Sequence, residues 1–335
     1  MLTVLENLKE TMKLNGTPDR FVNSWEFVNV VFATNYYMGD YPLQPGKEGY
    51  DQYGVLWRFP EGQMGAFPVH DAEHKLMDDV TEWKNVITHK PFIPDDPGYW
   101  GMLNGWAGKT DFENQYACAL APQGIFERLH AMMGMEDTMI GMYEEPEAMH
   151  ELIEFITEVE LEYAETIMTK VPAIKALLHH DDWGSAKNSF LSPEMHAEFL
   201  TPYYKRIYSR WKELGCELII HHSDSWSRNL VPQMIEMGID IWQGVFPDNN
   251  IPEMVEEFGD KITFMGEIES RRIDIPESTP EMVREEVERA CRKCKGHNFI
   301  PSLTAGTPGS SFPGIEQQVM DEINRMSKEL FGFEG

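Results

Sequence analysis

The sequence predicts an α/β protein, a (β/α)8 TIM barrel with an N-terminal helical and loop extension. From residue 173 onward, five short apolar segments alternate with amphipathic segments, which is the order of parallel strands joined by crossover helices. The short segments are almost continuously apolar, as strands are when both of their faces are covered. A doubly wound open sheet is the alternative, but no glycine-rich nucleotide-binding sequence follows a predicted strand.

The 335 residues are predicted to form a single barrel domain. About 1–110 make the N-terminal extension and lid, and 111–335 carry most of the βα units. Within the extension, residues 1–16 predict an amphipathic helix, and the Gly- and Pro-rich residues 23–74 predict short strands and loops. Residues 95–114, with two tryptophans, are predicted to be a loop.

Helices are expected around 124–133 and 147–168, ahead of the regular second half. Ser192 and Pro193 mark the start of the first helix of that half, because serine caps helices and proline suits their first position. The predicted strands lie within 173–184, 216–222, 239–246, 261–269 and 297–306. The predicted helices lie within 192–215, 227–238, 251–259, 279–296 and 314–332.

The strongly acidic charge of the chain excludes several classes of partner. A net charge of −28 repels nucleic acid and anionic membrane surfaces, since phosphate binding needs clustered Lys and Arg, and it also disfavours a polyanionic substrate. The first residues lack the apolar stretch of a signal peptide, and no apolar run is long enough to span a membrane. The four cysteines do not suggest a disulfide framework, so we expect a cytoplasmic protein. The Cys291-x-x-Cys294 pair lacks a second pair at zinc spacing and is interpreted as structural.

Polar side chains that can bind a metal or move a proton follow each of the five predicted strands. In a parallel barrel the carboxyl ends of the strands form one mouth, where functional residues lie. A strand-end aspartate such as Asp182 can also simply cap a helix, and only one of two adjacent histidines can face the barrel axis. We expect His221 to pack against a helix. The candidates are His179, His180, Asp181, Asp182, His221, His222, Asp224, Gln243, Glu267, Glu269, Ser302 and Thr304.

Several segments resemble the uroporphyrinogen decarboxylase superfamily, and the resemblance covers most of the chain. It implies a (β/α)8 barrel. One branch of the superfamily decarboxylates uroporphyrinogen and carries an arginine-rich N-terminal motif; the matching residues 22–31 here, VNSWEFVNVV, contain no arginine. The other branch transfers methyl groups to or from a corrinoid on a partner protein. The segments that carry the resemblance are 16–21, 142–153, 181–207, 218–225, 231–243, 254–269 and 279–287.

The methyltransferase branch often places H-x-C at the end of the strand that reads LIIHHSDS here, with a later cysteine, and these residues bind zinc and activate a thiol such as coenzyme M. In this chain His222 matches the histidine, Asp224 stands in place of the cysteine, and the later loop 301–309 has no cysteine. Asp, Glu and His form a harder ligand set, which suits a metal acting as a Lewis acid on oxygen. Similar family members demethylate methoxylated aromatics and pass the methyl group to Co(I) of a corrinoid protein.

The resemblance and the residues together predict a corrinoid-dependent methyltransferase that takes a methyl group from an O-methyl donor, an aryl methyl ether. We expect zinc, or a proton-donating cluster without metal, at His222, Asp224 and Glu267. Catalytic roles are expected for His180, Asp181 and Asp182. Residues expected around the aromatic substrate are Trp25, Tyr36, Tyr37, Trp100, Trp183, Trp226 and Gln243.

The corrinoid is expected on a separate protein, because the chain lacks a D-x-H-x-x-G cobalamin-binding motif. Three alternatives stay open at this point: a methylcobalamin:thiol methyltransferase, uroporphyrinogen decarboxylase, and a non-catalytic barrel that binds an aromatic ligand. The sequence leaves the identity of the donor and the oligomeric state open.

Overall fold

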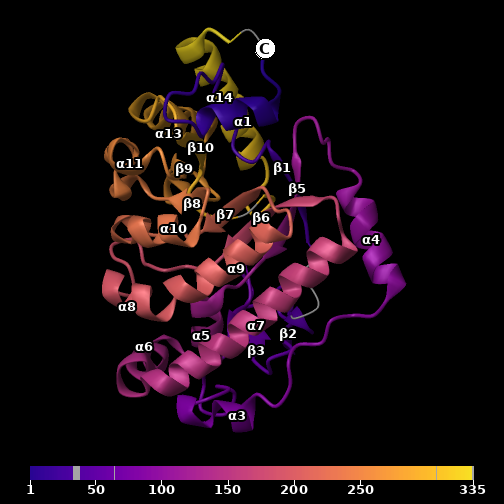
Figure 1. Ribbon diagram of the computed structural model, residues 1–335. Helices are drawn as coiled ribbons and strands as arrows, with labels where there is room; N and C mark the ends of the chain where they lie inside the picture. The colour runs from indigo at the N-terminus through magenta and orange to yellow at the C-terminus, as the bar shows by residue number, and fades with distance from the viewer. Residues whose placement is uncertain (33–37, 64, 307, 334–335) are drawn as a thin grey trace.

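Seven parallel strands form the main sheet of the computed structural model, which describes residues 1–335 except 33–37, 64, 307 and 334–335 (Figure 1). Their order is β1-β5-β6-β7-β8-β9-β10, so each strand after β5 pairs with the next one along the chain. The strands are β1 (Val28–Val31), β5 (Tyr116–Ala121), β6 (Ile174–His180), β7 (Leu218–His222), β8 (Ile241–Val245), β9 (Thr263–Ile268) and β10 (Phe299–Leu303).

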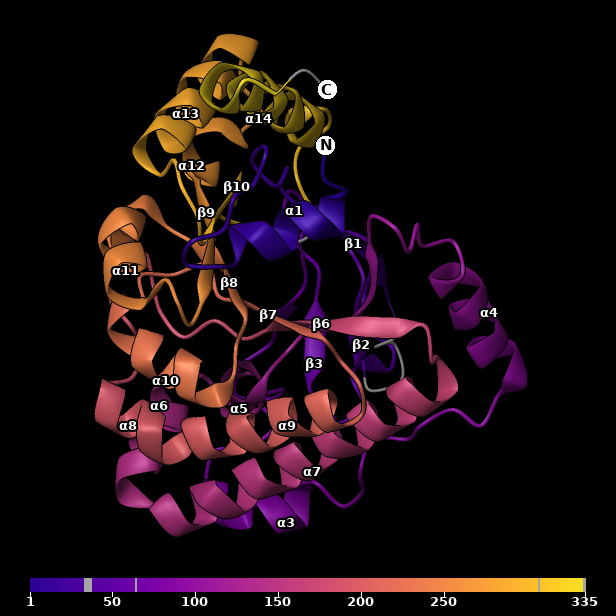
Figure 2. The same ribbon diagram turned by 45° about the horizontal axis from the view of Figure 1, so that its top comes forward.

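The sheet curls around an apolar interior. Alternate residues of all seven strands, from Val28 and Val30 in β1 to Ile300 in β10, meet in one buried cluster, which a flat sheet could not achieve. Helix α1 (Val4–Thr11) adds Leu8 to this cluster and lies across the sheet in Figure 2. The helix begins at Thr3, whose side chain accepts a hydrogen bond in a capping box.

The prediction of eight strands is corrected to seven among the described residues. No ladder joins β10 to β1 there; the buried segment 21–24 lies between them, with Ser24 Oγ 3.2 Å from Ser302 Oγ and Val22 in the interior cluster. The first half of the chain supplies only β1 and β5 to the main sheet. Its other strands, β2 (Glu48–Tyr50), β3 (Leu56–Arg58) and β4 (Phe67–Pro68), pair antiparallel in a separate sheet.

Helices cover the outer face of the curled sheet. The pairs α7 with α9 and α13 with α14 pack side by side (Figures 1 and 2). Helix α4 lies at the edge of the molecule, where Asn104 Nδ2 donates to Lys170 O, at the end of α7, at 2.8 Å. In the described part of the chain, no helix is long and apolar enough to cross a membrane. The remaining helices are η1 (Val80–Glu82), α3 (Trp83–Val86), α4 (Pro97–Ala107), α5 (Ile125–Met133), α6 (Met135–Glu144), α7 (Pro146–Lys170), α8 (Pro193–Phe199), α9 (Thr201–Glu213), η2 (Arg228–Leu230), α10 (Val231–Met237), η3 (Pro247–Asn249), α11 (Ile251–Phe258), α12 (Ser270–Ile273), α13 (Pro280–Lys293) and α14 (Ile315–Phe331).

Two predicted elements differ from the structure. The predicted loop 95–114 contains helix α4, because Asp96 caps it by accepting a hydrogen bond from Gly98 N at 2.8 Å and Pro97 begins it. The predicted helix 192–215 is two helices, α8 and α9. The break falls at Leu200, since Pro202 has no N–H to continue the ladder of α8. The five predicted strand–helix units from β6 onward are confirmed.

Gly124, the residue before α5, packs closely against Tyr204 of α9 and against Asp181, which follows β6. A Cβ atom at this position would be 2.0 Å from Tyr204 Oη and 2.6 Å from Asp181 Cβ, so any larger residue must displace one of them. Gly105 in α4 is a matched control, because nothing lies within 4 Å of a Cβ there.

We predict that Gly124→Ala lowers the free energy of unfolding by about 1–3 kcal/mol through overpacking. Gly105→Ala should instead raise it by about 0.5–1 kcal/mol, because alanine loses less backbone entropy in a helix. Urea unfolding followed by circular dichroism measures both. A wild-type midpoint for Gly124→Ala would contradict the close packing around this glycine.

Candidate metal centre

Three side chains of metal-ligand type meet at the carboxyl ends of β6 and β7. One ligand atom from each of His180, Asp182 and His222 lies within 4.8 Å of the other two. His180 and His222 are paired neighbours in the sheet, and their rings stack with centroids 4.4 Å apart. Two imidazoles and a carboxylate form a ligand set that zinc uses in proteins, with room left for a further ligand.

Gln243 orients the ring of His222. The Nδ1–H of His222 donates to Gln243 Oε1, and the amide is held in this sense because its Nε2 donates to Leu303 O at 3.2 Å. The lone pair of His222 Nε2 is therefore the one available to a metal. Burial, and secondly the charge of His180, lower the pKa of His222 to about 4, so the ring is neutral at neutral pH, as a metal ligand must be.

Glu127, in the first turn of α5, orients the ring of His180 in the same way. Its Oε2 lies 2.8 Å from His180 Nδ1. Burial alone would lower the pKa of His180, but the carboxylates of Glu127 and Asp182 outweigh it and raise the pKa to about 10. Glu127 is not among the residues predicted from the sequence. The one sequence feature that could have indicated Glu127 is its place in the first turn of the helix after a barrel strand. Many surface glutamates occupy that position, so it does not distinguish a functional residue.

Asp224 lies beside the cluster without belonging to it. Its backbone N donates to Asp182 Oδ1 at 2.9 Å, which orients the Asp182 carboxylate. Burial, and then the charge of Asp182, raise the pKa of the Asp224 carboxyl to about 8. At neutral pH this carboxyl therefore carries a proton next to the three ligand-type side chains.

Asp181, predicted to be catalytic, points away from the mouth. It is fully buried and accepts hydrogen bonds from Phe126 N at 3.0 Å and Glu127 N at 2.7 Å, so it caps the start of α5. Tyr204 Oη and Trp183 Nε1 donate to the same carboxylate at 2.5 and 2.8 Å. We correct its role from chemistry to holding the helix in place.

Glu267, predicted to be a metal ligand, lies on the outer side of the sheet. Its Oε1 is 2.6 Å from Arg289 Nη1 and 2.8 Å from Lys293 Nζ, both on α13. The register between β8 and β9 shifts between Gln243 and Val245 of β8, and Val245 pairs with Gly266. Glu267 itself has φ +69°, and its side chain turns away from the axis. The structure does not bring Glu267 to His222, and the predicted ligand set is corrected accordingly.

The predicted tryptophan walls are not at the mouth. Trp183 is buried and stacks on His221 with ring centroids 3.8 Å apart. Trp100 is buried on α4, Trp25 packs against the interior cluster, and Trp226 lines a separate pocket with Arg228, Asn229, Pro232, Glu257 and Phe258. Tyr36 and Tyr37 lie outside the described residues. Gln243, predicted to contact substrate, instead contacts His222.

A cavity of about 310 Å³ opens at the carboxyl ends of β1 and β5. Its lining is mostly apolar, and the amide of Gln123 and the hydroxyl of Tyr41 are the polar side-chain groups, which suits a small aromatic molecule. The described lining residues are Phe32, Met38, Gly39, Tyr41, Leu43, Leu120, Pro122 and Gln123.

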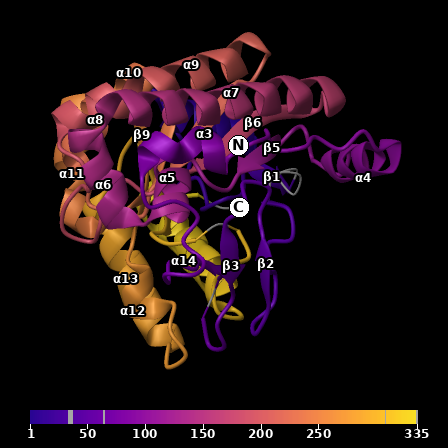
Figure 3. The same cartoon turned by 90° about the horizontal axis from the view of Figure 1, so that it is seen from below.

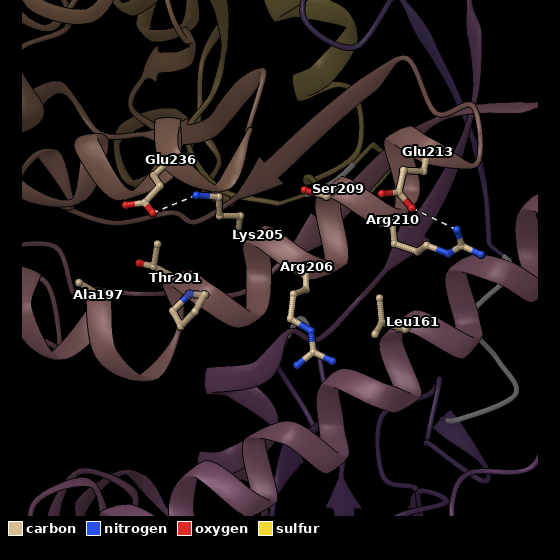
Figure 4. A pocket seen from close by; sticks show the side chains of 10 residues that line it. Leu161, Ala197, Thr201, Lys205, Arg206, Ser209, Arg210, Glu213 and Glu236 are labelled. Carbon is tan, nitrogen blue, oxygen red and sulfur yellow. Dashed lines mark hydrogen bonds and ion pairs between the residues drawn. The ribbon is translucent and has the colours of Figure 1, made fainter.

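A larger groove, of about 620 Å³, lies on the outer surface between α7, α9 and α10 (Figure 4). Its cations are all paired with carboxylates: Lys205 with Glu236, Arg206 with Glu154 and Glu158, and Arg210 with Glu165 and Glu213. These ion pairs link neighbouring helices, and none of the residues that line the groove belongs to the cluster.

His179 and His221, which alternate with the cluster residues along β6 and β7, are packed between the sheet and the helices. His179 lies against Tyr204 and Tyr208. His221 Nε2 donates to Asp181 O at 3.1 Å, so its Nδ1 accepts a hydrogen bond from Tyr208 Oη at 2.8 Å. His221 is therefore a packing residue, as expected from the sequence. His196 on α8 contacts Trp183 edge to face in the same layer.

A curled parallel sheet with polar side chains gathered at its mouth is typical of barrel enzymes. Residues 118–326, more than half of the chain, match the model of the uroporphyrinogen decarboxylase (URO-D) family, and the chain belongs to that family. This confirms the resemblance found in the sequence.

A solved structure shares the fold at low sequence identity. A methyltransferase from Methanosarcina mazei is similar with a TM-score of 0.64 and 11% identity, over 97% of this chain and 99% of that chain. A B12-independent methionine synthase from Shewanella sp. W3-18-1 has a TM-score of 0.47 and 14% identity, over 74% of this chain and 71% of that one. No curated protein matches the chain.

The buried histidines predict acid-sensitive folding. Burial lowers the pKa of His196 to about 3, and its Nε2 has no hydrogen-bond partner. The unfolded chain therefore binds a proton at this residue below about pH 6.5 whereas the folded chain does not, and the free energy of unfolding falls as the pH falls. His196 Nδ1 lies 3.1 Å from Thr201 Oγ1. His196→Asn keeps a hydrogen-bonding amide near this hydroxyl and removes the group that binds the proton.

Between pH 7 and pH 4.5 we expect the variant to lose about 2–3 kcal/mol less free energy of unfolding than the wild type. The exposed His89, changed to Asn, is the matched control for the substitution itself. Urea titrations at the two pH values measure the difference. Parallel losses in His196→Asn and the wild type would show that His196 is protonated in the folded chain.

Proposed function

We propose that this chain is a corrinoid-dependent methyltransferase that takes a methyl group from an aryl methyl ether and passes it to a corrinoid held by a separate protein. The observation that carries the proposal is the meeting of His180, Asp182 and His222 at the mouth of the sheet, with both rings oriented by partners. Membership of the URO-D family and the fold shared with a methyltransferase support it.

The three clustered side chains replace the predicted ligand set of His222, Asp224 and Glu267. His222 belongs to both sets, and Asp182 takes the place of a carboxylate ligand. The residues fit zinc, because Glu127 and Gln243 each engage Nδ1 of one imidazole and leave its Nε2 for a metal. The proton that the neighbouring carboxylates hold on His180 would be displaced on zinc binding. Zinc bound there would supply Lewis-acid chemistry toward the ether oxygen of the donor.

Asp224 is proposed as the proton donor to the leaving oxygen. The bond between the methyl carbon and the oxygen breaks with its electron pair staying on the oxygen, which takes a proton. The new bond to the methyl carbon is made with an electron pair of the acceptor. A phenolate has a conjugate-acid pKa of about 10 and leaves poorly, and general acid help is typically worth about 10²–10⁴-fold.

The alternatives find less support in the structure. Activation of a thiol uses thiolate ligands, but all four cysteines are buried and none joins the cluster. Decarboxylation of a substrate with many carboxylates needs cations at the mouth. Arg271, whose charge acts on Asp224, is instead paired with Glu269 at 2.7 Å.

The metal claim is tested by elemental analysis of purified variants. We expect about one zinc per chain in the wild type and loss of zinc in His222→Ala and Asp182→Ala. Gln243→Leu should weaken zinc binding by about 10–100-fold, because the partner of a ligand histidine orients it. His89→Ala, a histidine outside the cluster, is the control. Full zinc occupancy in His222→Ala would contradict the assignment of His222 as a zinc ligand.

The reaction is tested with a reduced corrinoid protein and a panel of methoxylated aromatics, methanol and methylamines, with cobalt methylation followed by absorbance. We expect methylation from aryl methyl ethers, and a rate about 10²–10⁴-fold lower in Asp224→Asn at unchanged zinc content. Methyl transfer to coenzyme M or homocysteine without any from methoxylated aromatics would instead establish the thiol enzyme.

A further inference from the structure

The cavity at the ends of β1 and β5 is close in size to one substituted aromatic ring. Its volume of about 310 Å³ is at the lower end of the roughly 300–1,000 Å³ that small-molecule sites occupy. Phe32 and Leu43 in its wall are 37% and 81% exposed, so they present apolar surface that a bound ring would cover. Leu120 and Pro122 supply the opposite, β5 side of the wall.

The cavity is joined to the candidate metal centre through the loop between β5 and α5. Gln123 lines the cavity, and the next residue, Gly124, donates from its backbone N to His180 O at 2.6 Å. Three residues further on, Glu127 contacts His180 Nδ1. Burial raises the pKa of Tyr41, another lining residue, and the charge of Glu127 adds to that shift, so the same carboxylate lies near both the cavity wall and His180.

The described lining residues offer two polar side-chain groups, the Tyr41 hydroxyl and the Gln123 amide. The Tyr41 hydroxyl donates to Ala66 O at 3.4 Å, whereas the Gln123 amide is incompletely paired. Its Oε1 is buried and accepts no hydrogen bond. A buried amide oxygen without a donor costs free energy, which a ligand recovers if it brings an N–H or O–H to that position. An amide oxygen accepts hydrogen bonds and does not donate them, so the matching group on the ligand is a donor.

We propose that this cavity binds the ring of the methyl donor and that Gln123 Oε1 accepts a hydrogen bond from a hydroxyl group on that ring. The inference rests on the proposed function, since the ring is that of the methyl donor named there. It makes Gln123 the residue that selects methoxyphenols over methoxybenzenes that lack a hydroxyl group.

The test measures binding without any methyl acceptor, by isothermal titration calorimetry with 2-methoxyphenol and methoxybenzene. We expect the wild type to bind 2-methoxyphenol up to roughly tenfold more tightly, and Gln123→Leu to lose this preference. Leu43→Ala, at an exposed position, should weaken both ligands alike. Gln317→Leu, an exposed glutamine on α14, is the matched control and should bind as the wild type does.

The outcomes separate this inference from the proposed function. Equal affinities in the wild type, or a preference that survives in Gln123→Leu, would overturn the role of Gln123 even if cobalt methylation is observed. A preference that depends on Gln123, with no cobalt methylation from any donor, would support the cavity assignment and overturn the methyl transfer. Unchanged binding in Leu43→Ala would show that the ring binds elsewhere.

Discussion

The carboxylate of Asp181 is the interaction on which the candidate site depends. It is fully buried at the end of β6 and accepts two backbone N–H groups from the first turn of α5. A buried carboxylate is tolerated only when hydrogen bonds replace its lost hydration, and Tyr204 and Trp183 complete that set. Helices α5 and α9 are thus fixed to one strand end, which determines where the first turn of α5 points.

Glu127 and Arg128, neighbours in the first turn of α5, connect the candidate metal centre with the N-terminal sheet. Glu127 reaches His180 in the cluster, and Arg128 forms a buried ion pair with Asp51 at 2.5 Å. Asp51 lies between β2 and β3, which stand beside α5 in Figure 3. The same helix turn therefore orients a candidate metal ligand and anchors the N-terminal sheet. Carboxylates also gather at this mouth, where they suit a cation rather than a polyanionic substrate.

Hydrophobic periodicity was enough to predict the five strands from β6 onward, but it could not predict backbone detail. Alternation along β6 and β7 turns His180 and His222 inward and His179 and His221 outward. The outward turn of Glu267 accompanies its own positive φ and a register shift in the neighbouring strand β8, and a hydrophobic pattern records neither of these backbone features. The contact between Glu127 and His180 joins residues 53 apart in the chain, so no local motif could reveal it.

The proposed chemistry requires that His180, Asp182 and His222 hold a metal without sulfur ligands. X-ray absorption at the zinc edge of the zinc-loaded protein measures this ligand set. We expect nitrogen and oxygen donors at about 2.0–2.2 Å with the multiple-scattering signature of two imidazoles, reduced to one in His180→Ala. Sulfur donors at about 2.3 Å, or an imidazole signal that is unchanged in His180→Ala, would contradict it.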